Sequence, residues 1–176
     1  MKEIVAVTKD WGIGKDNRLL VSIPEDMKFF RTKTKGAIVI MGRKTLESFP
    51  GGKPLKNRVN IVITRDKTYA PEGVVVVHDV NEAAAEAERI RKTDLLEDGS
   101  EREIFVIGGA SVYKQMIGLC DTAYVTKIDT VCKADAYFPD LDATEGWYLA
   151  EESEMMEHDG IKFRFTAYKK TIDIEK

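Results

Sequence analysis

The feature that most restricts the possible folds is a regular alternation of short apolar runs with helical patterns. Eight runs rich in β-branched and aromatic residues are predicted strands, at residues 4–7, 37–41, 59–63, 74–77, 104–107, 123–128, 147–151 and 163–168. Four helical patterns lie between several of these runs, at residues 24–33, 43–48, 81–91 and 111–117, the third with Asp79 and Glu82 as a predicted cap pair. Strands that alternate with helices predict a largely parallel sheet.

The predicted sheet is mixed rather than wholly parallel. Residues 38–41 and 104–107 are continuously apolar, which is typical of central strands covered on both faces. The last two runs flank a polar turn at residues 158–160, and the second of them alternates, so they predict a closing antiparallel hairpin. We therefore expect an α/β fold, with an eight-stranded, mostly parallel mixed sheet, a C-terminal antiparallel hairpin and four flanking helices.

Composition excludes several classes of protein. A chain of 176 residues, 43% of them hydrophobic, is expected to be one domain over residues 1–176, with a frayed polar tail at about 171–176. The net charge of −3 and the lack of a cationic run argue against a nucleic-acid or acidic-membrane surface. With two cysteines and two histidines at unsuitable spacings, we expect no metal site and two reduced thiols. No long apolar stretch occurs, so we expect a monomeric cytoplasmic protein.

The helix predicted at residues 24–33 has clear start signals. Ser22 is predicted to cap the first turn, and Glu25, three residues later, completes a capping box. Pro24 stands early in the helix, where its missing N–H costs nothing. The helix is therefore predicted to begin near Pro24.

One acid stands at the edge of the apolar stripe of this helix. At 100° per residue, Ile23, Met27 and Phe30 share a face, and Asp26 lies beside Phe30. A lone aspartate at such a margin is more often an exposed acid or a local cap. The alternative is a buried acid that binds a ligand, whose pKa desolvation would raise. The helix alone leaves both interpretations open.

Three predicted strands end in groups suited to an anion. These ends carry Gly42, Arg43, Lys44 and Thr45, then Gly108, Gly109, Ala110, Ser111, Val112 and Tyr113, and lastly Thr64 and Arg65. Each end alone is an ordinary turn with solvated cations, and the common G-x-G-x-x-G fingerprint is absent. Because ligands bind beyond the carboxyl ends of parallel strands, the three together point to one multiply phosphorylated ligand, such as a phosphorylated dinucleotide.

The residues alone do not decide the function of three further features. Arg58 follows the turn-rich stretch at residues 50–57 and is either a carboxylate anchor or an ordinary exposed cation. The irregular segment at residues 9–21 joins a strand to the Asp26 helix and is a candidate lid. The charged segment at residues 93–102 has no assigned use.

Six motifs together resemble the dihydrofolate reductase family, in order and spacing from Ile4 to about Lys169. They are Ile13-Gly14, Ile23-Pro24-x-Asp26-x-x-x-Phe30, Met41-Gly42-Arg43-x-Thr45-x-Glu47-Ser48, Pro54-Leu55-x-x-Arg58-x-Asn60, Ile107-Gly108-Gly109-x-x-Val112-Tyr113 and Phe138-Pro139. Each motif alone is weak, but six in register are very specific. The chain departs from the common pattern at Val21, where many members have Trp.

The resemblance implies NADPH-dependent reduction of 7,8-dihydrofolate to tetrahydrofolate, and binding of antifolate inhibitors. Hydride would pass from nicotinamide C4 to pterin C6, with water carrying the proton to N5. Asp26, supported by Thr126, would orient and polarise the pterin. The implied substrate contacts are Val5, Ala6, Asp26, Met27, Phe30, Leu55, Arg58, Ile107 and Thr126, with Arg58 holding the glutamate α-carboxylate. The implied cofactor contacts are Ala6, Ile13, Gly14, Gly42, Arg43, Lys44, Thr45, Thr64, Arg65, His78, Ile107, Gly108, Gly109, Ala110, Ser111, Val112 and Tyr113, with a cis Gly108–Gly109 peptide.

Two alternatives stay open at this point. A riboflavin-pathway pyrimidine reductase has the same architecture and also uses NADPH, but it would not need Asp26 together with Arg58. The other alternative is a nucleotide-binding module without catalysis, against which the retained acid argues.

Overall fold

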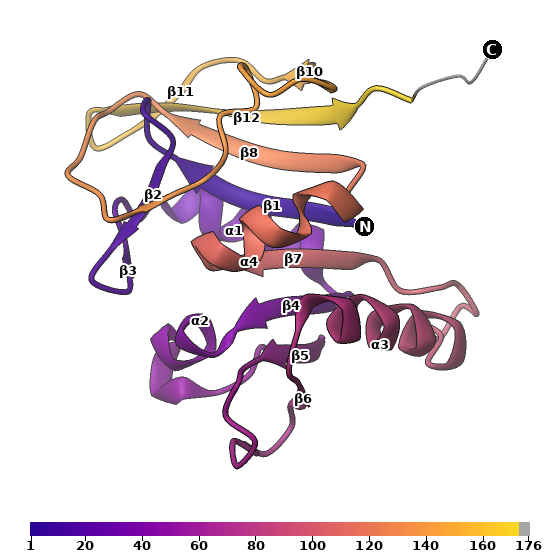
Figure 1. Cartoon of the computed structure of the whole chain (residues 1–176). Coiled ribbons are helices and arrows are strands. Elements are labelled where there is room, and N and C mark those ends of the chain that lie inside the picture. The colour runs from indigo at the N-terminus through magenta and orange to yellow at the C-terminus, as the bar shows by residue number, and fades with distance from the viewer. Residues whose placement is uncertain (173–176) are drawn as a thin grey trace.

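The computed structural model describes residues 1–172, which form a twisted sheet flanked by helices (Figure 1). Within this range the main sheet has nine strands. In sheet order they are β10 (Trp147–Glu152), β12 (Ile161–Lys170), β8 (Thr122–Ile128), β1 (Lys2–Val7), β7 (Ile104–Gly108), β4 (Ile38–Gly42), β5 (Val59–Ile63) and β6 (Val75–Val77), with β11 (Met156–His158) paired to β12. From β8 to β6 all neighbours are parallel, while β10, β11 and β8 are antiparallel to β12.

All eight predicted strands are present, and the predicted mixed sheet is confirmed. The closing hairpin needs a correction, because the turn at residues 158–160 joins β11 to β12 rather than β10 to β12. Asp159 and Gly160 both have positive φ, of 47° and 78°, which is the geometry of a two-residue hairpin turn. Residues 156–158 therefore add the ninth strand. Of the predicted tail, residues 173–176 lie outside the described part of the chain.

A second, small sheet was not predicted. It consists of β3 (Arg18–Leu19), β2 (Gly12–Lys15) and β9 (Ala136–Tyr137), in that order. The segment at residues 9–21 is thus largely a hairpin rather than an irregular loop. The backbone N–H of Asp16 at its tip donates to the Asp135 carboxylate at 2.9 Å, which ties the hairpin to the chain before β9.

The four predicted helices are present as α1 (Pro24–Thr34), α2 (Arg43–Ser48), α3 (Val80–Thr93) and α4 (Ala110–Met116). Asp79 caps α3 by accepting a hydrogen bond of 2.8 Å from the N–H of Glu82, as predicted. Short 3-10 turns occur at Pro50–Gly52 and Ile117–Leu119. No helix in residues 1–172 is long and apolar enough to cross a bilayer.

The predicted capping box of α1 is wrong. The N-cap residue is Ile23 in extended backbone, and no side chain caps this helix. The Ile23 side chain is only 2% exposed and packs with Ile128 and Phe163, so burial rather than a Ser22 hydroxyl fixes where the helix begins. Glu25 instead lies 3.1 Å from the Nδ1 atom of His158 in β11.

Two apolar clusters cover opposite faces of the sheet, as the alternation along β4 shows. Ile38 and Ile40 belong to a cluster that includes side chains of α3 and α4, whereas Val39 and Met41 belong to one that includes side chains of α1 and α2. All four β4 side chains are fully buried, which agrees with the predicted central strand.

Candidate active site

Asp26 meets Thr126 although the two residues are 100 positions apart in the chain. The Thr126 hydroxyl donates a hydrogen bond of 2.6 Å to Oδ1 of Asp26. Thr126 is 1% exposed and is aligned with Ala6 in the parallel pairing of β8 with β1. Burial raises the pKa of Asp26, and the Thr126 hydrogen bond offsets part of that rise. Asp26 is therefore a desolvated acid, and its interpretation as an exposed surface acid is wrong.

Most of the predicted substrate residues line the α1 side of the sheet. Phe30 and Leu55 are partly buried against the cluster that contains Ile107. Ala6 and Val21 pack against the apolar cluster of Ile23, Ile128 and Phe163. The Met27 side chain, next to Asp26 in the chain, remains 37% exposed. Val5 is different, because its side chain packs on the opposite face, toward α3 and α4. Only the backbone of Val5 can reach the α1 side.

Arg58 lies at the far end of α1 and is held by four hydrogen bonds. Its Nε and Nη2 atoms donate to the Thr34 hydroxyl at 3.2 and 3.1 Å, and Nη2 and Nη1 donate to the Arg31 and Lys56 carbonyls at 2.9 and 2.7 Å. Burial lowers the pKa of Arg58, and the charge of Arg31 lowers it further. No carboxylate within residues 1–172 forms an ion pair with it. The site therefore holds an oriented cation with no compensating charge.

The three predicted anion-binding ends lie on adjacent parallel strands, β7, β4 and β5, at the same edge of the sheet. The first two turns are in contact: a Cβ added to Gly42 would lie 3.4 Å from Val112, and one added to Gly109 would lie 3.5 Å from the Thr45 hydroxyl. The Gly108–Gly109 peptide is cis, as the resemblance implied. The Tyr113 hydroxyl donates to the Ile4 carbonyl at 2.7 Å, which ties α4 to β1.

The third end, after β5, brings Thr64 and His78 together. The Nδ1 atom of His78 lies 2.8 Å from the Thr64 carbonyl, and the Thr64 hydroxyl accepts the N–H of Asp66 at 3.1 Å. Asp66 also lies 3.8 Å from Arg43, so an acid stands beside one of the predicted phosphate ligands. Arg65 is exposed.

The tip of the β2–β3 hairpin reaches the same edge. The Asn17 side-chain amide donates to the Lys44 carbonyl in α2 at 3.0 Å. Ile13 is partly buried against the cluster that includes α4 side chains, Gly14 pairs with Leu19 in the hairpin, and Ala110 and Ser111 form the first turn of α4. The hairpin therefore contacts the anion-binding edge at its tip.

A family profile for dihydrofolate reductase matches residues 1–170. The chain belongs to the dihydrofolate reductase family. It is 37% identical over 166 residues to the dihydrofolate reductase of Neisseria gonorrhoeae, covering 94% of both chains. It is 36% identical over 162 residues to that of Bacillus subtilis, covering 90% of this chain and 87% of the relative. A solved dihydrofolate reductase from Enterococcus faecalis, complexed with NADP(H) and RAB-propyl, superposes with a TM-score of 0.80 at 31% identity, covering 96% of this chain and 95% of that one.

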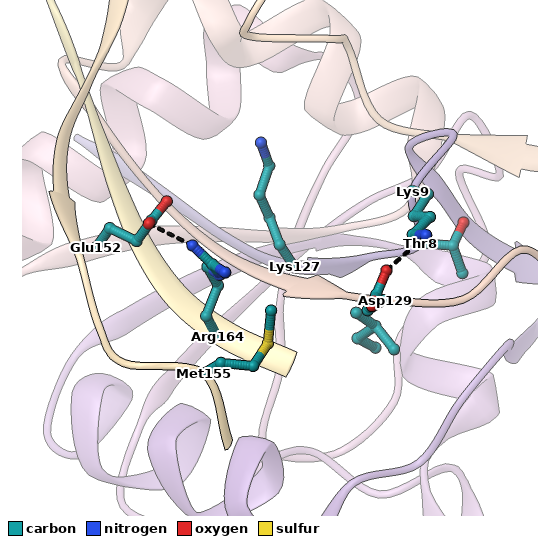
Figure 2. A pocket seen from close by; sticks show the side chains of 8 residues that line it. Thr8, Lys9, Lys127, Asp129, Glu152, Met155 and Arg164 are labelled. Carbon is teal, nitrogen blue, oxygen red and sulfur yellow. Dashed lines mark hydrogen bonds and ion pairs between the residues drawn. The ribbon is translucent and has the colours of Figure 1, made fainter. Parts of the chain in front are cut away.

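One hollow in the described part of the chain lies apart from Asp26 and Arg58. A pocket of about 320 Å³ lies at the ends of β1, β8 and β12 (Figure 2). It contains cations, but Lys9 pairs with Asp129 at 2.7 Å, and Arg164 pairs with Glu152. Lys127 pairs with Asp142 at 2.7 Å. Because each cation already has a carboxylate partner, this pocket offers little net charge to a ligand.

Sequence reasoning missed three residues that contact predicted site residues: Thr34 contacts Arg58, Asn17 contacts Lys44, and Asp66 lies near Arg43. Thr34 could have been recognised from the sequence. It stands one helical turn after Phe30, so it places a polar side chain on the apolar stripe of α1. Asn17 and Asp66 could not have been recognised, because both stand in polar turn segments where such residues are common. Within residues 1–172, no group of three or more His, Cys, Asp or Glu side chains is arranged to hold a metal ion.

Proposed function

We propose that the protein reduces 7,8-dihydrofolate to 5,6,7,8-tetrahydrofolate with NADPH. The observation that carries this proposal is the pair of groups at the two ends of α1: a desolvated Asp26 bonded to Thr126, and an unpaired Arg58 cation. Family membership supports the reaction, and the Enterococcus faecalis neighbour was solved with NADP(H).

The spacing along α1 suits a long, flat substrate with an acid at one end. Asp26 and Thr34, which holds Arg58, are eight residues apart, which is about 12 Å of helix. Asp26 would hydrogen-bond the 2-amino group and N3 of the pterin, while Arg58 would bind the glutamate α-carboxylate. Between them, Phe30, Leu55 and Ile107 offer apolar surface that aligns the rings and excludes water.

The residues at the strand ends fit NADPH, which supplies the hydride from C4 of its nicotinamide when bound. Arg43, Lys44, Thr45, Thr64 and Arg65 offer cations and hydroxyls to phosphates, and His78 stands at the same edge. Gly42 and Gly109 carry no side chain where their two turns meet, so a cofactor can approach the backbone closely there. Ala6, Ile13 and the residues from Ile107 to Tyr113 would surround the nicotinamide side.

Asp26 acts by orienting and polarising the pterin rather than by handing a proton to N5. An acid bonded to N3 and the 2-amino group lies on the opposite side of the pterin from N5. Water would carry that proton, admitted by movement of the β2–β3 hairpin. The hairpin is held at its tip by the Asn17 contact with Lys44 and the Asp16 contact with Asp135, so both must break for the tip to lift.

One assay tests the proposal. Purified protein is mixed with NADPH and dihydrofolate, and nicotinamide oxidation is followed for the wild type, Asp26→Asn and the exposed-loop control Asp98→Asn. We expect dihydrofolate-dependent oxidation that falls by about a hundredfold in Asp26→Asn and is unchanged in Asp98→Asn. No dihydrofolate-dependent oxidation by the wild type would refute the reaction. Full turnover by Asp26→Asn at neutral pH would refute the role of the acid instead.

The same assay separates the alternatives. A riboflavin-pathway pyrimidine reductase would oxidise NADPH without responding to dihydrofolate, and a nucleotide-binding module would bind NADPH without turnover. Antifolate binding, a monomeric state, one domain over residues 1–176 and a cytoplasmic location stay predictions that accompany the proposed function.

A further inference from the structure

Thr34, the last residue of α1, makes contacts that an ordinary helix-end threonine does not need. Its side chain is fully buried, and its hydroxyl donates to the Phe30 carbonyl at 2.8 Å while accepting two N–H groups of Arg58. A hydroxyl has one donor and two acceptor sites, so all of them are used. The helix backbone thereby fixes the direction in which the hydroxyl oxygen faces Arg58.

We propose that Thr34 is a positioning residue for carboxylate recognition: it sets the orientation of the Arg58 guanidinium before the substrate binds. This inference rests on the proposed function, in which Arg58 receives the glutamate α-carboxylate. Thr34 itself does not touch the substrate. It acts through the plane of the guanidinium, because a planar fork binds a carboxylate well only from fixed directions.

The charges around Arg58 explain why a positioning contact is needed. Arg31 is close enough for its charge to oppose that of Arg58, and no described carboxylate holds the guanidinium in place. Without Thr34, only the Arg31 and Lys56 carbonyls would keep the side chain against α1. Repulsion from Arg31 and the attraction of bulk water would then favour rotamers that point into solvent. Thr34 offsets both effects before any ligand arrives.

The experiment compares two substrates in four single variants and one double variant. Dihydrofolate carries the glutamate carboxylates, and dihydropteroate is the same pterin and benzoate without the glutamate. Thr34→Val removes the hydroxyl and keeps the shape, and Thr34→Ser restores the hydroxyl. Thr93→Val is the matched control, because the Thr93 hydroxyl makes the same bond to a helix carbonyl, Arg89 at 2.9 Å, without contacting an arginine side chain of the site. Arg58→Leu completes a double-mutant cycle with Thr34→Val.

We expect Thr34→Val to raise KM for dihydrofolate by about tenfold, which is the scale of one lost hydrogen bond to a charged group. The KM for dihydropteroate and for NADPH should stay within about twofold. Thr34→Ser should behave like the wild type, and Thr34→Val should have no further effect in the Arg58→Leu background. Should Thr34→Val fold poorly, Thr34→Ala provides the same comparison.

Four results would overturn the inference. Equal rises in KM for both substrates would make Thr34 merely structural, as would additive effects of Thr34→Val and Arg58→Leu. An unchanged KM for dihydrofolate in Thr34→Val would show that Thr34 does not position Arg58, while leaving the role of Arg58 intact. A wild type that uses the two substrates with equal KM would remove the role of Arg58, and with it that of Thr34, although the reaction itself would stand.

Discussion

The Thr126 hydroxyl lies 2.6 Å from Oδ1 of Asp26 and joins the centre of the sheet to the first turn of α1. The two residues come from elements 100 positions apart, so the acid is held by the fold rather than by its own helix. Burial and this hydrogen bond act on the pKa of Asp26 in opposite directions, and burial is the larger effect. The Thr126 hydroxyl therefore offsets part, but not all, of the rise that burial causes in the pKa of Asp26.

Replacing Thr126 should change the pH dependence of the reaction. The hydroxyl stabilises the carboxylate form of Asp26, so Thr126→Val should raise the pKa of Asp26 further. The inflection that Asp26 contributes to kcat/KM should move to higher pH, and Thr126→Ser should keep the wild-type profile. A profile that moves to lower pH in Thr126→Val would contradict this account of the pair.

Removing the charge of Asp66 should strengthen cofactor binding. Asp66 lies 3.8 Å from Arg43 and repels any phosphate that this arginine binds. Asp66→Asn keeps the Oδ1 acceptor used by Thr68 and loses only the charge. We expect its Kd for NADPH to fall by about two- to fivefold at low salt, with a smaller change at high salt.

Fluorescence titration with NADPH and NADH measures this effect. Arg43→Ala should weaken NADPH binding more than NADH binding, because the latter lacks the extra phosphate. The remote Asp98→Asn variant should bind like the wild type. Weaker NADPH binding by Asp66→Asn would mean that the acid supports the turn rather than opposing the phosphate.

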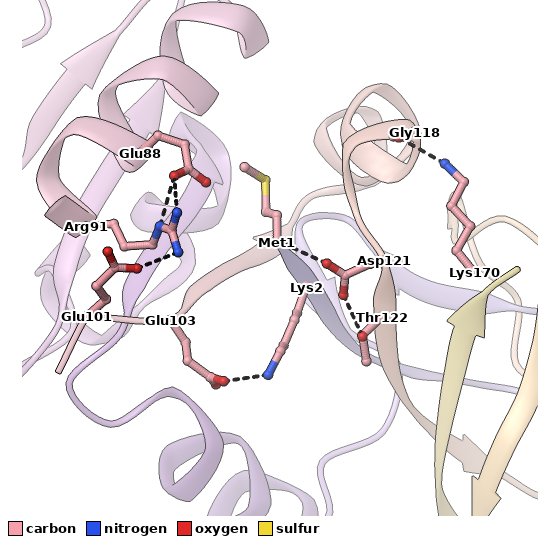
Figure 3. Close-up of polar contacts among 10 residues, drawn as sticks. All are labelled: Met1, Lys2, Glu88, Arg91, Glu101, Glu103, Gly118, Asp121, Thr122 and Lys170. Atoms are coloured by element: carbon pink, nitrogen blue, oxygen red, sulfur yellow. Dashed lines mark hydrogen bonds and ion pairs between the residues drawn. The ribbon is translucent and has the colours of Figure 1, made fainter. Parts of the chain in front are cut away.

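Glu3 should make the protein less stable as pH rises. The Met1 amine pairs with Asp121 at 3.3 Å and Lys2 with Glu103 at 2.5 Å (Figure 3), whereas Glu3 is fully buried in the same strand. Neither oxygen of its carboxyl group has a hydrogen-bond partner within residues 1–172. Burial raises the pKa of Glu3 to about 9 from 4.5.

Between these two pH values the folded protein holds a proton that the unfolded chain has lost, so the free energy of unfolding falls with rising pH. The slope is at most about 1.4 kcal/mol per pH unit. The Gln side chain of Glu3→Gln cannot lose a proton. The free energy of unfolding of this variant, relative to that of the wild type, should therefore increase from about pH 5.5 to 8.5. Urea denaturation at several pH values measures this. The exposed-strand control Glu151→Gln should track the wild type, and a constant difference for Glu3→Gln would disprove the linkage.

The two thiols should differ in reactivity. Cys120 is 2% exposed, and burial, followed by the charge of Glu3, raises its pKa to about 12, whereas Cys132 is half-buried. A disulfide reagent at about pH 8 should therefore modify one thiol in the native protein and two in denaturant. Cys132→Ser should lose the fast reaction. Equal rates for both thiols in the native protein would contradict the packing around Cys120.

The central strands could be predicted from the sequence because their pattern is local. The five residues of β5 were predicted with the observed bounds, β7 ends one residue later than predicted, and β4 is shifted by one residue at both ends. In each case a buried parallel strand needs a continuous apolar run, which is visible without knowledge of its neighbours. The strand-end glycines and cations were likewise visible, and the sheet order brings them to one edge.

The remaining features depend on partners distant in sequence. The two residues of β9 form a strand only because β2, more than a hundred residues earlier, lies beside them. Ser22 had the right type and position for a cap, but burial of Ile23 decided the helix start. Glu3 follows a lysine and looks solvated, but it is fully buried, and it lies close enough to Tyr113 and Cys120, more than a hundred residues later, for its charge to affect both.

The place of β1 in the sheet also bears on synthesis of the chain. This strand is the first to be made, yet its neighbours are β7 and β8, which begin at Ile104 and Thr122. Until Ile104 and the residues after it have been made, Ile4, Val5 and Val7 lack the strands that flank them in the sheet, and such non-local pairings slow folding. A ribosome-bound nascent chain therefore carries an apolar strand that waits for its partners, and early termination leaves that strand available for aggregation.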